Sequence, residues 1–320
     1  MADGAAPARS APRALRSYHH RDFAVDRILA EKGATTVSVC LPARDEAATI
    51  GPIVEVLRDE LLRPGAIDEV VVLDDHSSDD TATVARRAGA RVVDAASVLA
   101  DHGGGHGKGE VLWKSMFVTE GDVIVWCDSD ITEFGSRFVS GIVGALLCEP
   151  DVDLAKAHYH RPERDREGGG RVTELVARPL LSLFFPELAG LHQPLSGEYG
   201  GRRRVLEQLP FVQGYGVDIG LLIDLATTFG VAGLVQVDLD VRHHRNRTLD
   251  ELGPQAMAIL QTVLRRVDPT LVPAAAQLLR PELLEGGGTD LTLGSVDVNE
   301  RPPPVEVDSY RALRTTAASN

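Results

Sequence analysis

Short apolar runs alternate with segments of helical periodicity through the first half of the chain. The pattern predicts strands at 37–41, 67–74, 91–94 and 122–128 and, between them, helices at 47–62, 79–88 and 108–118. Strands that alternate with helices in this way build a parallel sheet with helices on both faces. We therefore predict a Rossmann-like α/β fold with a mainly parallel sheet.

The alternation loosens after about residue 136. The pattern predicts first a helix, then a strand near 152–159, a helix near 172–185, loops through 215, a helix at 217–229, a strand at 234–241, and helical segments at 249–266 and 270–280. Residues 1–20 are rich in Ala, Arg and Ser, and residues 285–320 contain EGGGTD and RPPPVEV. We expect a disordered arm at the first end and a flexible tail at the other.

Charge and cysteine content narrow the class of protein. A net charge of −14 disfavours nucleic acid as the main partner, because that partner needs a broad basic face. Two local basic clusters, Arg202–Arg204 and Arg242–Arg247, leave small anions open, although the triplet equally fits a solvated face. Cys40, Cys127 and Cys148 are an odd number in apolar segments, which indicates reduced thiols in the cytoplasm. We predict neither export nor stable membrane insertion.

Carboxylates follow two of the predicted strands. Asp74 and Asp75 end one apolar run, and Asp128 and Asp130 follow GDVIVW. Ligands of parallel sheets bind beyond the carboxyl ends of the strands. Helix capping explains Ser78 or Asp79 well, but two carboxylates two residues apart repel unless a cation or hydrogen-bond donors lie between them. An Asp-x-Asp also occurs in many surface turns, but its place after a buried strand favours either ribose binding or a divalent cation that bridges the phosphates of a nucleotide diphosphate.

Glycine-rich segments supply two candidate anion sites. DHGGGHGKGE lacks the glycine and hydroxyl positions of a Walker A loop, and no GxGxxG follows the first strand. Lys108 at a helix start still fits a diphosphate, with a solvated lysine as the alternative. Gly170, Arg171 and Thr173 begin another predicted helix, where Arg171 favours phosphate over simple capping. His244 follows a late strand and is a possible metal ligand.

Longer stretches of the chain resemble a known family. LPARDEAATI, VVVLDDHSSDDTATVA and VIVWCDSD resemble the donor-binding half of GT-A glycosyltransferases. GKGEVLWKS, GGGRVTELVARPLLSLFFPELAGLHQPLSGEYGGRR, GYGVDIGLLID and DVRHHRNRTLDELG resemble the glucosyl-3-phosphoglycerate synthases, actinobacterial enzymes that start methylglucose lipopolysaccharide synthesis. The likeness covers about residues 20–280.

The resemblance implies a cytoplasmic, homodimeric, retaining hexosyltransferase that uses UDP-glucose, D-3-phosphoglycerate and Mg²⁺ or Mn²⁺. It implies a donor half at 21–135 and an acceptor half with C-terminal helices at 136–284. The implied donor-binding residues are Pro42, Ala43, Arg44, Glu46, Asp75, Lys108 and Asp128. The implied acceptor-binding residues are Gly170, Arg171, Val172, Thr173 and Asn246, and the implied metal ligands are Asp130 and His244.

The reaction centre has no obvious covalent nucleophile. The resemblance places Asp128 and Asp218 near the reacting sugar, and for retention we favour front-face attack with the backbone from Leu195 to Gly197 supporting the developing positive charge. Two positions depart from the family's pattern. Asp218 stands where family members can have Glu, and the end of the first strand reads Ala-Arg-Asp-Glu where related enzymes often have a neutral pair before the acidic residue.

Other functions remain open from the sequence. Within transferases, the alternatives are GDP-mannose as donor or a polyprenyl phosphate as acceptor, the latter disfavoured because no amphipathic segment is evident. A non-catalytic nucleotide-binding module would not need Asp130, His244 and Arg171 together. A sugar nucleotidyltransferase would need a glycine-rich signature near the N-terminus.

Overall fold

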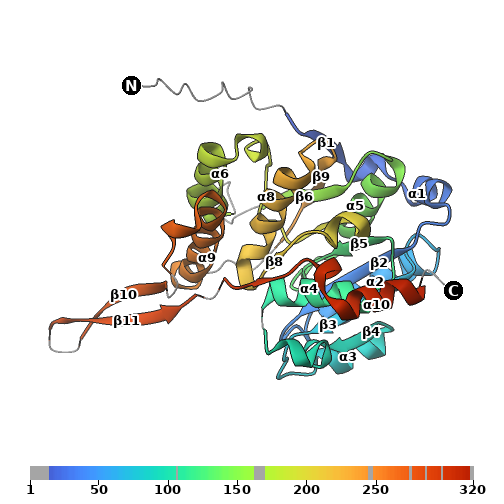
Figure 1. Ribbon diagram of the computed structural model, residues 1–320. Helices are drawn as coiled ribbons and strands as arrows, with labels where there is room; N and C mark the ends of the chain where they lie inside the picture. The colour runs from blue at the N-terminus through green and yellow to red at the C-terminus, as the bar shows by residue number, and fades with distance from the viewer. Residues whose placement is uncertain are drawn as a thin grey trace, which may run out of the picture.

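The computed structural model describes residues 14–105, 107–161, 170–243, 248–273, 276–284, 287–296 and 298–317. A single eight-stranded sheet forms its centre (Figure 1). In spatial order the strands are β1 (Arg16–His19), β9 (Leu234–Val241), β6 (Leu154–His160), β7 (Tyr199–Arg202), β5 (Val123–Trp126), β2 (Val37–Ala43), β3 (Glu69–Asp74) and β4 (Arg91–Asp94). Strands from both predicted halves therefore share one sheet.

Only β7 runs against its neighbours in this sheet. It pairs antiparallel with β5 and β6, and every other neighbouring pair is parallel. The mainly parallel sheet predicted from the sequence is confirmed. The antiparallel strand was not predicted, because Tyr-Gly-Gly-Arg has no strand signal. Its glycines serve close packing: a Cβ on Gly200 would overlap the backbone of β5.

Helices cover both faces of the sheet. One face carries α1 (Val25–Lys32), α2 (Ile50–Leu57), α3 (Thr81–Ala88) and α5 (Arg137–Cys148). The other carries α4 (Lys108–Val118), α6 (Arg178–Phe184), α7 (Arg203–Leu206), α8 (Val217–Phe229), α9 (Leu249–Val267) and α10 (Asp308–Ala317). No helix in the described ranges is both long and apolar enough to span a bilayer.

The side chains of the strands point alternately into two hydrophobic cores, one on each face of the sheet. On β5, Val123 and Val125 pack toward the first group of helices, whereas Ile124 and Trp126 pack toward the second. Successive strand residues point to opposite faces, so a strand buried on both sides is apolar throughout. This explains the continuous apolar runs in the sequence.

Both ends of the chain differ from the prediction. Residues 16–19 lie within the predicted disordered arm, but they form the edge strand β1 paired with β9. The predicted helix at 270–280 is wrong: a short 3₁₀ turn at Pro269–Leu271 precedes β10 (Gln277–Leu283), which forms a hairpin with β11 (Thr289–Ser295). Leucine alternates with polar residues in β11, and its pairing with β10 holds residues 277–283 as a strand although their own sequence does not alternate.

The predicted flexible tail also packs on the body. β12 (Glu300–Arg301) pairs with β8 (Phe211–Val212), and Tyr310 of α10 is buried in the second core. Buried Arg203 donates to backbone carbonyls of Met116, Thr119 and Gly121 and also contacts the Tyr310 hydroxyl. Proline and polar residues suggested disorder, but one aromatic side chain anchors the segment.

Candidate functional site

A cavity of about 650 Å³ opens at the carboxyl ends of the parallel strands. It is where a doubly wound sheet places its ligands. Every described residue that the sequence nominated lines it: Pro42, Ala43, Arg44, Glu46, Asp75, Lys108, Asp128, Asp130, Gly170, Arg171, Val172, Thr173, Leu195 and Asp218. Asn246 and His244 lie outside the described residues.

The loops after β2 and β3 are tied together at one end of the cavity. The backbone N–H of Glu46 donates to Thr81 Oγ1 at 2.7 Å, and Asp75 accepts from the backbone N–H of Gly107 at 3.0 Å. Burial raises the pKa of Glu46. Asp79 accepts N–H groups from Thr81 and Ala47, so its capping role is confirmed.

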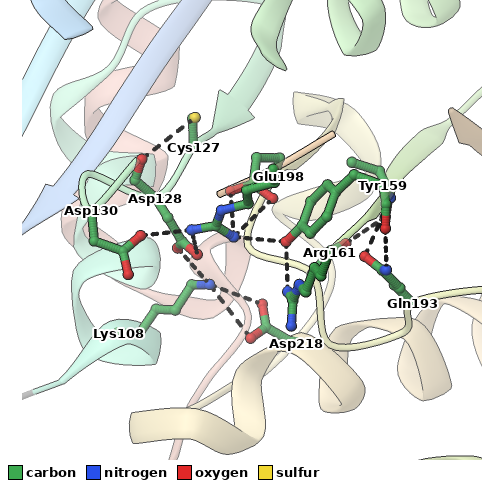
Figure 2. A network of polar contacts seen from close by, with 12 residues as sticks. Lys108, Cys127, Asp128, Asp130, Tyr159, Arg161, Gln193, Glu198 and Asp218 are labelled. Atoms are coloured by element: carbon green, nitrogen blue, oxygen red, sulfur yellow. Dashed lines mark hydrogen bonds and ion pairs between the residues drawn. The ribbon is translucent and has the colours of Figure 1, made fainter. Parts of the chain in front are cut away.

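Asp128 and Asp130, the two carboxylates that follow β5, lie close together in the polar network of Figure 2, and both contact Arg242. Its Nη2 donates to Asp130 Oδ1 at 2.6 Å and contacts Asp128 Oδ2 at 3.3 Å. The sequence predicted that a cation or donors must separate Asp128 and Asp130, and this guanidinium supplies them. Arg242 is only 4% exposed, so its charge acts in a poorly hydrated environment.

Lys108 joins the same carboxylate cluster from the start of α4. Its Nζ lies 3.0 Å from Asp128 Oδ1 and 3.4 Å from Asp218 Oδ1. Burial disfavours the charged ammonium, but Asp128 and Asp218 outweigh it and hold the pKa of Lys108 above its usual value. Burial likewise opposes ionisation of Asp128, but Lys108 and Arg242 outweigh it and lower the pKa of this carboxyl. Both groups are therefore charged at neutral pH.

A second row of side chains holds Arg242 from behind. Its Nη1 lies 3.0 Å from Oε1 of Glu198 and donates to the Tyr159 hydroxyl at 2.7 Å. Arg161 donates to the same hydroxyl at 2.7 Å. Burial raises the pKa of Glu198, which Arg242 opposes. A fully buried carboxyl beside a buried guanidinium fixes that guanidinium in one place.

The helical segment that begins after Gly170 forms the opposite wall. Gly170 adopts φ +93°, and a π-helical turn, η5 (Thr173–Ala177), leads into α6. Thr173 is buried, and it lines the cavity together with Arg171. Backbone N–H groups at a helix start together with a guanidinium favour an anion. The predicted helix start is confirmed, and its phosphate role stays a prediction.

The carboxylates fit the metal that the resemblance implies. Asp130 lines the cavity with 45% of its side chain exposed, so its carboxylate is accessible to a cation. Carboxylate oxygens are the ligands that Mg²⁺ and Mn²⁺ prefer. Gly197 passes so close to Asp128 that any Cβ there would overlap the carboxylate, which fixes that side chain against the loop.

No histidine among the described residues lines this cavity. His243 is about half exposed and contacts Glu133 at 3.6 Å. Within the described ranges, ligand atoms of the kinds that bind metals gather as a trio at His19, His20 and Asp240. Arg21 donates to the same Asp240 carboxylate at 2.7 Å, so that group is an ion-pair cluster at the edge of the sheet.

The two predicted basic clusters have different structural roles. Arg202 and Arg203 donate to backbone carbonyls, and Arg204 pairs with Asp153, so the triplet holds the fold together and binds no substrate in the cavity. Arg242 of the second cluster lines the cavity. Sequence reasoning singled out neither Glu198 nor Lys156. A lone lysine inside the apolar strand LAKAHYH was the available signal for the latter.

Comparison with known proteins gives consistent matches. The family described as "Glycosyl transferase family 2" matches residues 38–207. A glucosyl-3-phosphoglycerate synthase of Petrotoga mobilis is 45% identical over 79% of this chain and 81% of its own length.

Two solved structures cover nearly all of the chain. The Mycobacterium tuberculosis glucosyl-3-phosphoglycerate synthase in complex with Mn²⁺, UDP-glucose and phosphoglyceric acid has a TM-score of 0.81 and 41% identity, covering 92% of this chain and 98% of that chain. The mannosyl-3-phosphoglycerate synthase of Rubrobacter xylanophilus has a TM-score of 0.83 and 36% identity, covering 91% and 95%.

Proposed function

Because the chain belongs to the glucosyl-3-phosphoglycerate synthases within glycosyltransferase family 2, we propose that it transfers glucose from UDP-glucose to D-3-phosphoglycerate. The products are glucosyl-3-phosphoglycerate and UDP. One observation supports this most: a single cavity joins the carboxylates after β5 to the helix start at Gly170–Thr173. A donor diphosphate and an acceptor phosphate thus have separate partners in one space.

The donor occupies the end of the cavity formed by the β2 and β3 loops. Pro42, Ala43, Arg44 and Glu46 face the uridine with Asp75 nearby, and Asp128 contacts the donor sugar or the ribose; all six line the cavity. Lys108 is charged and half enclosed by carboxylates, so it offers its remaining N–H donors to the donor. Asp130 and His244 are the proposed ligands of Mg²⁺ or Mn²⁺, which neutralises the diphosphate when bound.

The acceptor occupies the opposite wall. The backbone N–H groups near Gly170, Val172 and Thr173, with the Arg171 guanidinium, take the acceptor phosphate. Asn246 is the further acceptor-binding residue that the resemblance implies. This arrangement turns the hydroxyl of phosphoglycerate toward the sugar. Binding two reactants in one orientation removes much of the entropic barrier to transfer.

The chemistry proceeds on one face of the sugar. The departing diphosphate takes the proton of the attacking hydroxyl, and the new bond forms on the side from which the nucleotide leaves, so the anomeric configuration is retained. Leu195 lines the cavity, and backbone carbonyl groups of its segment stabilise positive charge on the sugar. Asp218 lies beside Lys108 near this centre.

A second candidate function uses GDP-mannose in place of UDP-glucose. The fold matches the Rubrobacter mannosyl-3-phosphoglycerate synthase at a TM-score of 0.83, so the scaffold suits both donors. The test gives the protein equal amounts of the two nucleotide sugars with 3-phosphoglycerate and Mn²⁺, and identifies products by mass and NMR. Glucosyl product in excess supports the proposal, whereas mannosyl product in excess assigns the second function.

The enzyme works as a homodimer in the cytoplasm. The hairpin β10–β11 projects from the body (Figure 1) and exposes Leu279, Leu283, Leu291 and Leu293, a surface suited to a second copy of the chain. The three cysteines are unpaired, which fits a reducing compartment. Light scattering after chromatography tests the dimer: the double variant Leu279→Lys, Leu293→Lys should elute as a monomer. An unchanged mass would contradict this interface.

A further inference from the structure

Lys156 is a fully buried ammonium beside the reaction centre. It lies on β6 with 1% of its side chain exposed, and it does not belong to the residues that the family resemblance assigned. Burying a charge without compensation is costly, so an amine kept at this depth needs specific partners. Its partners belong to the segments that contribute Leu195 and Asp218 to the catalytic cavity.

Three groups surround the Lys156 ammonium. Its Nζ donates to the Ser196 carbonyl at 2.8 Å, lies 3.7 Å from Asp218 Oδ1, and sits 3.7 Å from the centre of the Tyr199 ring. A carbonyl, a carboxylate and a π face together satisfy a buried cation. The side chain therefore links the loop before β7 to the start of α8.

The Ser196 contact completes a clamp on the segment that carries Leu195. Gln193 Nε2 donates to the Tyr159 carbonyl at 2.5 Å, and Ser196 Oγ donates to the Ala157 carbonyl at 2.6 Å. Both bonds tie the loop to β6, and Lys156 adds the bond to the Ser196 carbonyl. The Cα of Ser196 joins the rigid peptide plane 195–196 to the plane 196–197. The hydrogen bonds that hold Ser196 therefore also restrict the direction of the Leu195 carbonyl.

The Asp218 contact sets the balance of charge around Lys108. Asp218 lies between two ammonium groups, Lys108 at 3.4 Å and Lys156 at 3.7 Å. Lys108 in turn divides itself between Asp218 and Asp128. Without Lys156, Asp218 would face one cation in place of two and would draw Lys108 away from Asp128 and the reacting sugar.

We propose that Lys156 is a positioning residue for glucosyl transfer, one that orients the Leu195 backbone and Asp218 without touching either substrate. Removing its charge should therefore slow the transfer step and spare the binding of UDP. Since the proposal rests on the transfer reaction, its test includes UDP binding and thermal stability, which report on the protein even when no product forms.

The first test is Lys156→Met, which keeps the length of the side chain and removes the charge. We expect kcat to fall by roughly 100-fold, which is the loss of rate that a displacement of about 1 Å at a reaction centre causes. The dissociation constant of UDP with Mn²⁺ should stay within about threefold of wild type. Tm should fall, because Asp218 and the Ser196 carbonyl lose a buried partner. A kcat within about threefold of wild type would overturn the proposal.

Lys114→Met is the matched control. Lys114 is also buried and donates to a backbone carbonyl, that of Ala95 at 2.7 Å, but it lies outside the cavity lining. We expect its kcat to stay within about threefold of wild type. An equal loss of kcat in both variants would mean that buried lysines matter here only for folding, and the proposal would fail.

Lys156→Arg and the pH profile cover the case in which the methionine variant does not fold. The arginine keeps the charge, so the kcat of Lys156→Arg should be at least about tenfold higher than the kcat of Lys156→Met. Burial lowers the pKa of Lys156 to about 8, although Asp218 and, further off, Glu198 and Asp128 raise it while Lys108 lowers it further. Wild-type kcat should therefore fall as pH rises through this region, and the arginine variant should stay active. Identical alkaline profiles in both proteins would overturn the proposal.

Discussion

Arg242 Nη2 and Asp130 Oδ1 lie 2.6 Å apart, and the same guanidinium nitrogen reaches Asp128 Oδ2 at 3.3 Å. Two carboxylates that follow one strand are thereby bridged by a residue that follows β9, and Lys108 supplies a second positive charge beside Asp128. Arg242 is itself held by Glu198, so the arrangement exists before any substrate arrives. A site that is ordered in advance loses less free energy when charge develops in the transition state.

Asp130→Asn should abolish turnover while the protein stays folded. The amide keeps the size of the side chain and can still accept from Arg242, but it lacks the charge that a metal ligand needs. We expect an unchanged Tm and no product at saturating Mn²⁺ and UDP-glucose. Glu133→Gln is the control, because that carboxylate is 73% exposed and lies outside the cavity lining. Wild-type turnover in Asp130→Asn would refute the assignment.

Arg171→Ala should weaken 3-phosphoglycerate far more than UDP-glucose. A charge-assisted hydrogen bond is worth about 1.5–3 kcal/mol, which corresponds to roughly a ten- to hundredfold loss of acceptor affinity. The measurement is KM for each substrate with the other saturating. Arg63→Ala, a surface arginine paired with Asp59, serves as control. Equal losses for donor and acceptor would show that Arg171 shapes the shared cleft.

His244→Ala should remove the pH dependence of metal affinity. An imidazole binds metal only when neutral, so wild-type affinity for Mn²⁺ should fall as pH drops through roughly 6–7, where a histidine gains its proton. The variant should bind weakly at every pH. His243→Ala is the control, since His243 faces Glu133. If His243→Ala loses metal-dependent activity and His244→Ala keeps it, the assignment is wrong by one residue.

Asp240→Asn should loosen the edge strand β1. The Asp240 carboxylate takes hydrogen bonds from His19, His20 and Arg21, and the one from His20 does most to lower its pKa to about 2. Asparagine tolerates the left-handed backbone at this position, φ +64°, so the change tests the charge alone.

The sign of the pH effect follows from that lowered pKa. The folded-state pKa of Asp240 lies below its ordinary value of 3.8, so its stabilisation is complete above that value and is lost as pH falls toward 2. The hydrogen-exchange protection factors of the amides of residues 16–19, which correct for the intrinsic pH dependence of exchange, should be lower in Asp240→Asn than in wild type at pH 7. They should fall toward pH 2 in wild type and change less in the variant. Unchanged exchange would contradict the role of this cluster. Asp59→Asn, a surface variant on another face, is the control.

Strand ends were the predictable part of this site. Apolar runs followed by Asp75 or Asp128 located the cavity, because period and polarity change together where a strand leaves the sheet. Arg242 was visible only as part of a basic cluster, since nothing in RHHRNR indicates which arginine turns inward. Lys156 and Glu198 come from β6 and from the loop before an antiparallel strand. These two segments lie side by side because β6 and β7 are neighbours in the sheet, and local sequence does not encode that strand order.

The ends of the chain show a related limit. Composition predicted disorder for residues 16–19 and for the C-terminal segment, yet both are held by partners far away in the sequence, β9 and Arg203. The edge strand has a ladder on one side, and the C-terminal segment is held by the Arg301–Glu110 ion pair, the Trp113 bond to the Pro302 carbonyl and buried Tyr310. Long-range pairing of this kind overrides a weak local preference.

Transfer of glucose to 3-phosphoglycerate with retention of the anomeric configuration can be followed by ¹H NMR of the reaction mixture. Protein, UDP-glucose, 3-phosphoglycerate and Mn²⁺ are incubated, Mn²⁺ is removed, and the new anomeric signal is recorded. The account predicts one new doublet with the small coupling of an α-linked glucose, absent when 3-phosphoglycerate is omitted. A large β-type coupling, or release of UDP with free glucose as the sole product, would contradict it.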